Sequence, residues 1–424
     1  MADRIRSLLV GAVFLAVVLT TTKGDAQGVL APPPSNLSGL PPGMQTTGTN
    51  QPGVLLQAAP PTATNTELAL LEWGPVQFHP HFLYRLLYGD GIPAQPGQDY
   101  KTFINQIYPG VLFQLGNHWA LDYTPIFSFY SDNHFRDTWD NTVTLVGGTT
   151  FEDWTLGFSQ GYISSSEPLI ETGGQTDTAT HSTALNAVFQ ASSVASIELA
   201  ANQTLLFYGQ GPTSEPLNDQ GLWSTRDWFN YQVDPKLTLG LGVGFGYDKL
   251  KLSPDMTHEE LQGRVNWRPG PKLTVLVSAG AEYRQFLSSD VSASLNPIFG
   301  ASALYQVFEP TTLSLTASRS FSPAGFVGQL ADSTTLMASV RQRLLTKLFL
   351  DASGGYFTTS YSATEAGLAV SRNDHGTFLN LRLSLQVLKR GTAAVFYHRS
   401  ENSSDQAIFT YSSSQVGFEL GYRF

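Results

Sequence analysis

The chain ends in a stretch whose side chains alternate between apolar and polar. Counting back by twos from the last residue gives Phe424, Tyr422, Leu420, Phe418 and Val416, and the residues between them are Arg423, Gly421, Glu419, Gly417 and Gln415. A period of two places successive side chains on opposite faces, so the pattern predicts a β-strand with one apolar face. Because chain ends normally fray, a strand that reaches the final residue is unusual. It is expected where that residue sits in a sheet at the edge of a membrane.

The composition favours many such strands over membrane helices. Only 14% of the residues are charged, well below the roughly 25% usual in soluble domains. Aromatic residues make up 12%, and the mean hydropathy is −0.09. Strands with a single lipid-facing side produce this combination. The net charge of −10 argues against a nucleic-acid partner, and the absence of cysteine excludes disulfides and cysteine-ligated metals.

The same alternation recurs in stretches that begin near residues 76, 119, 237 and 273. Their apolar faces carry no charge, while the opposite faces do. An Arg or Lys that faces lipid costs about 2–4 kcal/mol at the bilayer midplane, so charge-free faces are typical of lipid contact. A soluble β-sandwich also has one apolar face. It does not need strands of ten or more residues with aromatic side chains toward both ends.

Short turns and longer polar loops alternate between these strands. Eight short connections, such as 234–236 and 309–311, recur about every 40 residues, the length of one hairpin. Nine longer polar stretches lie between them, at 89–99, 131–137, 163–180, 209–222, 248–257, 287–294, 320–333, 358–375 and 400–410. We therefore predict an all-β fold over residues 75–424. It is a transmembrane up-and-down antiparallel β-barrel of about 18 strands (roughly 16–20), with short periplasmic turns and long outer loops.

The terminal strand resembles the closing strand of Gram-negative outer-membrane β-barrels, and the layout of residues 75–424 resembles the β-barrel porin (BBP-type) families. The resemblance implies that Leu420, Tyr422 and Phe424 form an assembly signal read by the barrel assembly machinery. It also implies a place in the cell outer membrane, in contact with lipid and lipopolysaccharide. The implied function is a porin-like channel for passive diffusion of small hydrophilic solutes, with no cofactor. The alternative is a barrel component or scaffold of a polysaccharide export or envelope assembly system.

The first 74 residues differ in character from the rest. Residues 1–26 predict a secretory signal peptide, because Arg4 and Arg6 precede an apolar run too short to span a bilayer. A short anchor helix is the alternative. Residues 27–74 are rich in proline and indicate a disordered or polyproline-like periplasmic linker, or a plug for the lumen. Within them, residues 67–73 have room for one or two helical turns.

Charged side chains on the inward faces are the candidate site residues. The hypothetical lumen-lining set is Arg85, Arg226, Glu260, Arg264, Arg268, Glu282, Arg284, Arg341, Arg343, Asp351 and Arg382. Arg suits both ion pairs that brace a wall and the capture of carboxylates or phosphates. Acidic residues nearby on the same or neighbouring strands favour bracing, and no ion preference follows. A barrel of this size leaves an aqueous channel, which an inward-folded loop can narrow. Loops 163–180, 209–222 and 358–375 are long enough.

Three motifs could indicate chemistry. Residues 157–161 match the G-x-S-x-G nucleophile motif around Ser159, but the strand alternation runs through them without the helix that the motif requires. His79 and His81 share one face at a spacing that can bind a metal, with no third ligand evident. The glycines of 240–246 resemble a phosphate loop only if the alternation is ignored, and in a strand they thin or bend the wall. We therefore expect no catalytic, cofactor-binding or metal site and no enzymatic activity.

Overall fold

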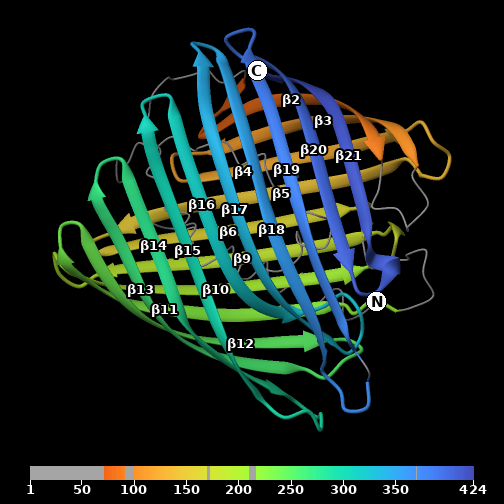
Figure 1. The fold of residues 1–424 in the computed structure, drawn as a ribbon. Coiled ribbons are helices and arrows are strands. Elements are labelled where there is room, and N and C mark those ends of the chain that lie inside the picture. Colours follow the sequence, from red (N-terminus) through yellow and green to blue (C-terminus); the bar gives the residue numbers. More distant parts are fainter. Residues whose placement is uncertain (1–70, 91–99, 170–171, 210–215, 369) are drawn as a thin grey trace.

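The computed structural model describes residues 71–90, 100–169, 172–209, 216–368 and 370–424. Long antiparallel strands dominate these residues and wrap around a central space (Figure 1). The main sheet holds 19 strands, one of them a short N-terminal extension, and the other eighteen form the wall of a closed barrel. The predicted fold class and strand number are confirmed. In the part of the chain that the structure covers, no helix has the length and apolar character needed to cross a membrane.

The wall strands follow one another in chain order, each paired with the next. They are β2 (Val76–Asp90), β3 (Lys101–Leu115), β4 (Trp119–Tyr130), β5 (Thr138–Phe151), β6 (Trp154–Ser165), β9 (Thr178–Gln190), β10 (Ala195–Tyr208), β11 (Gln220–Asp234), β12 (Leu237–Leu250), β13 (Met256–Gly270), β14 (Leu273–Phe286), β15 (Ser294–Phe308), β16 (Thr311–Pro323), β17 (Gln329–Leu345), β18 (Leu348–Ala363), β19 (Arg372–Gln386), β20 (Gly391–Ser404) and β21 (Tyr411–Arg423). The short elements are β1 (Leu71–Trp73), the pair β7 (Pro168–Leu169) and β8 (Gly174–Gln175), and the 3₁₀ turn η2 (Ala407–Phe409). The eight short turns and nine longer connections between wall strands occur where the sequence predicts them.

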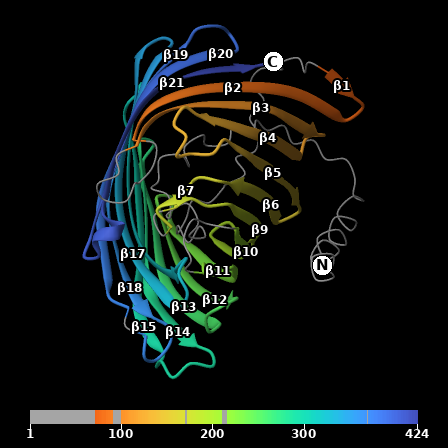
Figure 2. The same ribbon diagram turned by 90° about the vertical axis from the view of Figure 1, so that its right-hand side faces the viewer.

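The barrel closes between β2 and β21, as the alternation at the chain end predicts. The two strands pair from His81↔Arg423 to Gly89↔Gln415, and the Phe424 N–H donates to the Pro80 carbonyl at 2.9 Å. Pro80 has no N–H to donate, and it lies at the point where β21 ends, so no β21 carbonyl is left without a donor there. The closure defines an inside and an outside for every strand (Figure 2).

The short strand β1 forms a hairpin with the start of β2, pairing Trp73 with Val76. Because β3 occupies one edge of β2 along its whole length, β1 and β21 lie end to end on the other edge. The suggestion of helical turns at residues 67–73 is therefore wrong for 71–73, where the chain pairs as a strand. Residues 67–70, the predicted signal peptide and nearly all of the proline-rich segment lie outside the described residues.

The outward faces carry a band of exposed apolar side chains. On β12, Leu239, Leu241, Val243 and Phe245 are between 43% and 60% exposed. Soluble monomers rarely expose continuous apolar surface on this scale. Surrounding hydrocarbon accounts for it, because lipid-facing and lumen-facing residues alternate along each strand of a membrane barrel.

Candidate functional site

The inner surface of β12 is a strip of four glycines, and each leaves room for a large side chain from a neighbouring strand. A Cβ atom on Gly242 would lie 2.6 Å from the Trp228 ring, and one on Gly246 would lie 2.0 Å from the Cε1 atom of His258. Gly244 makes the same kind of room for Glu260. The sequence predicts that these glycines thin the wall, and the structure shows what fills the space.

Arg264 lies flat on this strip. Its guanidinium sits 4.2 Å from the centre of the Trp228 ring, and its Nη2 atom donates to Glu198 at 2.6 Å. The same atom donates to the Asn230 side chain at 2.7 Å. The Arg264 charge is therefore fully engaged by the wall, which supports bracing as its role.

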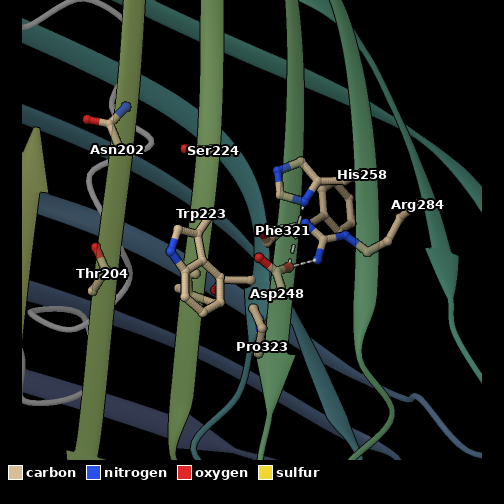
Figure 3. A pocket seen from close by; sticks show the side chains of 11 residues that line it. Asn202, Thr204, Trp223, Ser224, Asp248, His258, Arg284, Phe321 and Pro323 are labelled. Atoms are coloured by element: carbon tan, nitrogen blue, oxygen red, sulfur yellow. Dashed lines mark hydrogen bonds and ion pairs between the residues drawn. The ribbon is translucent and has the colours of Figure 1, made fainter. Parts of the chain in front are cut away.

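A buried ionic cluster continues the strip toward the outer loops. Arg226 pairs with Glu260 at 2.7 Å, and Arg284 pairs with both Asp248 at 2.6 Å and Glu282 at 2.7 Å. Arg284 is only 1% exposed. Figure 3 shows Asp248, His258 and Arg284 converging beside Phe321. Burial strengthens these pairs and makes the loss of one partner costly.

A second network joins the strands on either side of the seam. Glu419 on β21 forms an ion pair with Arg85 from β2 at 2.9 Å and accepts a hydrogen bond from Arg382 on β19 at 2.8 Å. The Arg85 guanidinium also lies 4.7 Å from the centre of the Phe396 ring on β20. One carboxylate thus connects four consecutive strands through two arginines.

The remaining predicted site residues lie nearer the short turns and are more exposed. Arg341 is 3.6 Å from Asp351, and the Arg341 side chain is 67% exposed, so this pair contributes little. Arg268 and Arg343 are exposed and form no ion pair within the described part of the chain. The structure therefore brings the predicted residues together in separate groups, not in one continuous ladder.

Sequence reasoning misses Asp248 and His258, because both fall in or next to the stretch 248–257, where the sequence predicts a loop. In the structure, β12 extends to Leu250 and β13 begins at Met256. The available signal was the alternation itself, which continues with Asp248 and His258 in step with the inward glycines and Glu260. In the sequence, polar residues at inward strand positions next to a loop cannot be distinguished from the polar residues of the loop itself.

The end of β16 separates from β15, while β17 stays paired with β18 as far as Gln329↔Ala363. Pairing between β15 and β16 stops at Phe299↔Arg319, whereas β16 and β17 remain paired to Pro323↔Leu330. We call residues 320–333 the mouth hairpin. The sequence predicts a loop there, but most of these residues are strand, and only the tip at 324–328 is a turn.

The mouth hairpin contacts loops from distant parts of the barrel rim. The Asn218 N–H donates to the Gly325 carbonyl at 2.9 Å, and Phe326 packs on Phe409 with ring centres 5.9 Å apart. Deeper in, Arg284 donates to the Phe321 carbonyl at 3.3 Å. Since the strands that flank Asn218 and Phe409 are far from β16 in the ring, the hairpin tip and these two loops meet over the outer opening.

The mouth hairpin was not among the three stretches considered long enough to fold inward. Of those three, 209–222 contributes Asn218 to its contacts, and 358–375 contributes the Thr364 N–H, which donates to the Gly328 carbonyl at 2.9 Å. The third, 163–180, contains β7 and β8 and is tied to the β4–β5 loop, where the Arg136 N–H donates to the Gln175 side chain at 2.8 Å.

The two motifs weighed for chemistry are parts of the wall. Ser159 lies inside β6, paired with Val146 and Ala184, and the strand continues to Ser165 without a helix, which confirms the strand interpretation. His81 approaches Asp122 at 3.0 Å, next to Thr124. That contact orients the imidazole in the wall.

Comparisons with known proteins identify similar folds. No family model and no curated protein sequence matches the chain. Among solved structures, Acinetobacter baumannii OccAB3 is similar over 82% of this chain and 99% of its own, with 11% identity and a TM-score of 0.44. Pseudomonas aeruginosa OccK2, solved in complex with glucuronate, covers 82% and 98%, with 12% identity and a TM-score of 0.44. The siderophore receptor PirA from Pseudomonas aeruginosa covers 81% and 80%, with 9% identity and a TM-score of 0.43. The barrel assignment rests on the strand pairing of this chain.

Proposed function

We propose that this protein is an outer-membrane, porin-like channel for the passive diffusion of small hydrophilic solutes. The observation that carries the proposal is the closed wall of eighteen strands, apolar outside and polar inside. Barrels of 16–18 strands are wide enough to leave an aqueous lumen. Diffusion needs only a water-filled path and a gradient, so no cofactor is required.

The inner wall supports hydrophilic and uncharged solutes in particular. Ser314, Ser339, Ser353 and Asn380 stand directly opposite one another across β16, β17, β18 and β19, forming a row of neutral hydroxyl and amide groups. The most buried arginines are held by carboxylates of the wall, as the Arg284 contacts illustrate. A solute therefore meets neutral hydrogen-bonding groups more often than unpaired charge.

The mouth hairpin limits the size of what can pass. Its tip meets the loops around Asn218 and Phe409 across part of the outer opening, and the hairpin is fixed at both its base and its tip. A narrowed mouth favours small solutes over polymers. This counts against an open exit for polysaccharide, though a scaffold role in envelope assembly would not need an open lumen.

The membrane partners follow from the same proposal. The apolar band would contact outer-membrane lipid and lipopolysaccharide. Leu420, Tyr422 and Phe424 on the closing strand would be read by the barrel assembly machinery. Tyr422 and Phe424 are partly exposed, with ring centres 4.7 Å apart, so they present a continuous aromatic surface to a partner.

Planar-bilayer recording of the purified full chain tests the channel. Steady ohmic steps that scale with salt concentration are expected, together with swelling of proteoliposomes in small neutral sugars. A barrel that inserts but neither conducts nor admits sugars would overturn the proposal. If that barrel also captured periplasmic proteins, and lost them on deletion of residues 27–66, the scaffold function would replace the channel.

A further inference from the structure

The buried cluster beneath the mouth hairpin contains more negative than positive charge. Three carboxylates, on Asp248, Glu260 and Glu282, face the two guanidiniums of Arg226 and Arg284. The three acids are between 2% and 8% exposed. An uncompensated charge at such burial is expensive, and the carboxylates and guanidiniums taken alone leave the cluster one positive charge short.

The positions of two of the acids add electrostatic repulsion to this excess of negative charge. Glu260 on β13 and Glu282 on β14 stand directly opposite each other on the inner face. Like charges in directly opposed positions destabilise a sheet. Arg226 pairs with Glu260 and Arg284 with Glu282, so each of the two opposed carboxylates has one guanidinium.

A histidine completes the group at this point. His258 is 5% exposed, its Nε2 atom lies 3.9 Å from Glu260, and its Nδ1 atom lies 3.6 Å from Asp248, beyond hydrogen-bond distance. One ligand atom each from His258, Glu260 and Glu282 lies within 4.8 Å of the other two. Among the described residues this is the one group of three or more such ligands with that spacing.

We propose that His258, Glu260 and Glu282 bind a divalent transition-metal ion of the Zn²⁺ type in the lumen wall. Tetrahedral coordination places ligand atoms about 3.4 Å apart, for bonds of about 2.1 Å, so the side chains close by roughly an ångström on binding. An imidazole with two carboxylates suits Zn²⁺ better than Ca²⁺ or Mg²⁺, which prefer oxygen ligands alone. The two positive charges of the ion more than offset the single negative charge in excess.

The surroundings fit a bound ion. A pocket lined by Asn202, Thr204, Ser224 and Ser322 adjoins His258 and gives room for water beside the imidazole (Figure 3). Gly246 gives the imidazole its place against β12, since any side chain there would occupy the ring position. Gln262 donates to Glu260 at 2.8 Å and orients that carboxylate.

Calorimetric titration of Zn²⁺ into the chelator-treated full chain in detergent tests the site. One equivalent is expected to bind, Ca²⁺ is expected not to, and Glu282→Gln or His258→Asn should abolish the binding. His81→Asn is the matched control, because His81 is the other wall histidine next to a carboxylate. Binding that survives His258→Asn but disappears in His81→Asn would overturn the proposal, as would no Zn²⁺ binding at all.

A glycine variant keeps the test valid if the ligand variants do not fold. Gly246→Ala leaves all three ligands in place but displaces the imidazole, so Zn²⁺ affinity should fall about 10- to 100-fold. Unchanged affinity in folded Gly246→Ala protein would count against this site. The result does not depend on channel activity, because binding is measured without conduction.

Discussion

Arg85 and Glu419 face each other directly across the seam of the barrel, with the Arg85 Nε atom 2.9 Å from the Glu419 carboxylate. The two residues come from the first and last wall strands, so their contact exists only when the cylinder is closed. Arg382 holds the same carboxylate from β19. The charges that the sequence places inside the barrel thus also secure its closure.

Glu419→Gln should destabilise the closed barrel. The substitution keeps the shape of the side chain but leaves Arg85 and Arg382 close together without an anion. We expect a loss of about 1.5–3 kcal/mol in the free energy of unfolding, measured in urea with folded vesicle-inserted protein. Arg343→Gln, which removes an exposed arginine with no ion pair in the described structure, should change it little. Equal effects of both variants would show that Glu419 has no special role.

Gly242→Ala should disturb the inner wall more than Gly263→Ala on the next strand. A Cβ on Gly242 meets the Trp228 ring at 2.6 Å, whereas one on Gly263 comes no nearer than 4.0 Å to the Ala279 carbonyl oxygen. Overpacking at the first position should cost about 1–3 kcal/mol and shift tryptophan fluorescence as Trp228 moves off Arg264. If the two variants had equal stability and fluorescence, the glycines of β12 would not be needed to make room for the side chains that pack on them.

A disulfide between positions 217 and 326 should hold the mouth hairpin against the opposite rim. Leu217 and Phe326 form an isolated antiparallel bridge, and the chain has no cysteine of its own to interfere. Leu217→Cys with Phe326→Cys, once oxidised, should suppress any fluctuation in single-channel conductance that comes from hairpin movement, and a reductant should restore it. Shortening the tip at 324–328 should raise the mean conductance about twofold, since the hairpin covers part of the mouth. Conductance unaltered by either change would place the constriction elsewhere.

Glu198→Gln should make the channel more selective for anions. Arg264 then loses its carboxylate, and the lumen gains one positive charge. The anion-to-cation permeability ratio, taken from the reversal potential in a salt gradient, should rise about twofold. Glu259→Gln makes the same change of charge on an exposed residue paired with outward-facing Phe245 and Tyr283, so it should leave the ratio unaltered.

Deleting Phe424 should impair insertion into the outer membrane, measured as the fraction of heat-modifiable barrel in membrane preparations. The deletion removes both the terminal aromatic ring and the N–H that bonds to Pro80. Phe424→Tyr keeps both and should insert normally. Normal insertion of the deleted chain would count against Leu420, Tyr422 and Phe424 as an assembly signal.

The strands were predictable because alternation is a local property. Residues 237–247 show their apolar and glycine faces without reference to any other part of the chain, and the short turns carry Pro and Gly at fixed places. Closure was predictable for a related reason, since a final strand such as β21 has one obvious free partner. The seam pairing from His81 to Gly89 follows directly.

The site was harder to predict because its contacts depend on register across several strands. Arg264 reaches Glu198 over two intervening strands, and nothing near either residue in the sequence indicates the other. The mouth hairpin was missed for a similar reason. Its polar, proline-containing residues look like a loop, and the contacts that hold it inward, such as Asn218 with Gly325, join distant parts of the chain. The local alternation of side chains thus predicts the strands of the wall. The contacts inside the barrel depend on residues that are distant in the sequence, so the alternation does not predict them.

The shared edge of β2 has a consequence for the order in which the barrel is built. Because β21 is the last strand of the chain, the edge of β2 from His81 to Gly89 stays unpaired until all the intervening strands have taken their places in the wall. An open strand edge is a template for wrong partners. The hairpin with β1 needs only neighbouring residues and can form at once, covering Val76 to Phe78. The hairpin leaves the rest of this edge of β2 free for β21, and the free part begins next to Pro80, where Phe424 binds. By blocking pairing beyond that point, β1 helps the final strand to adopt the correct register.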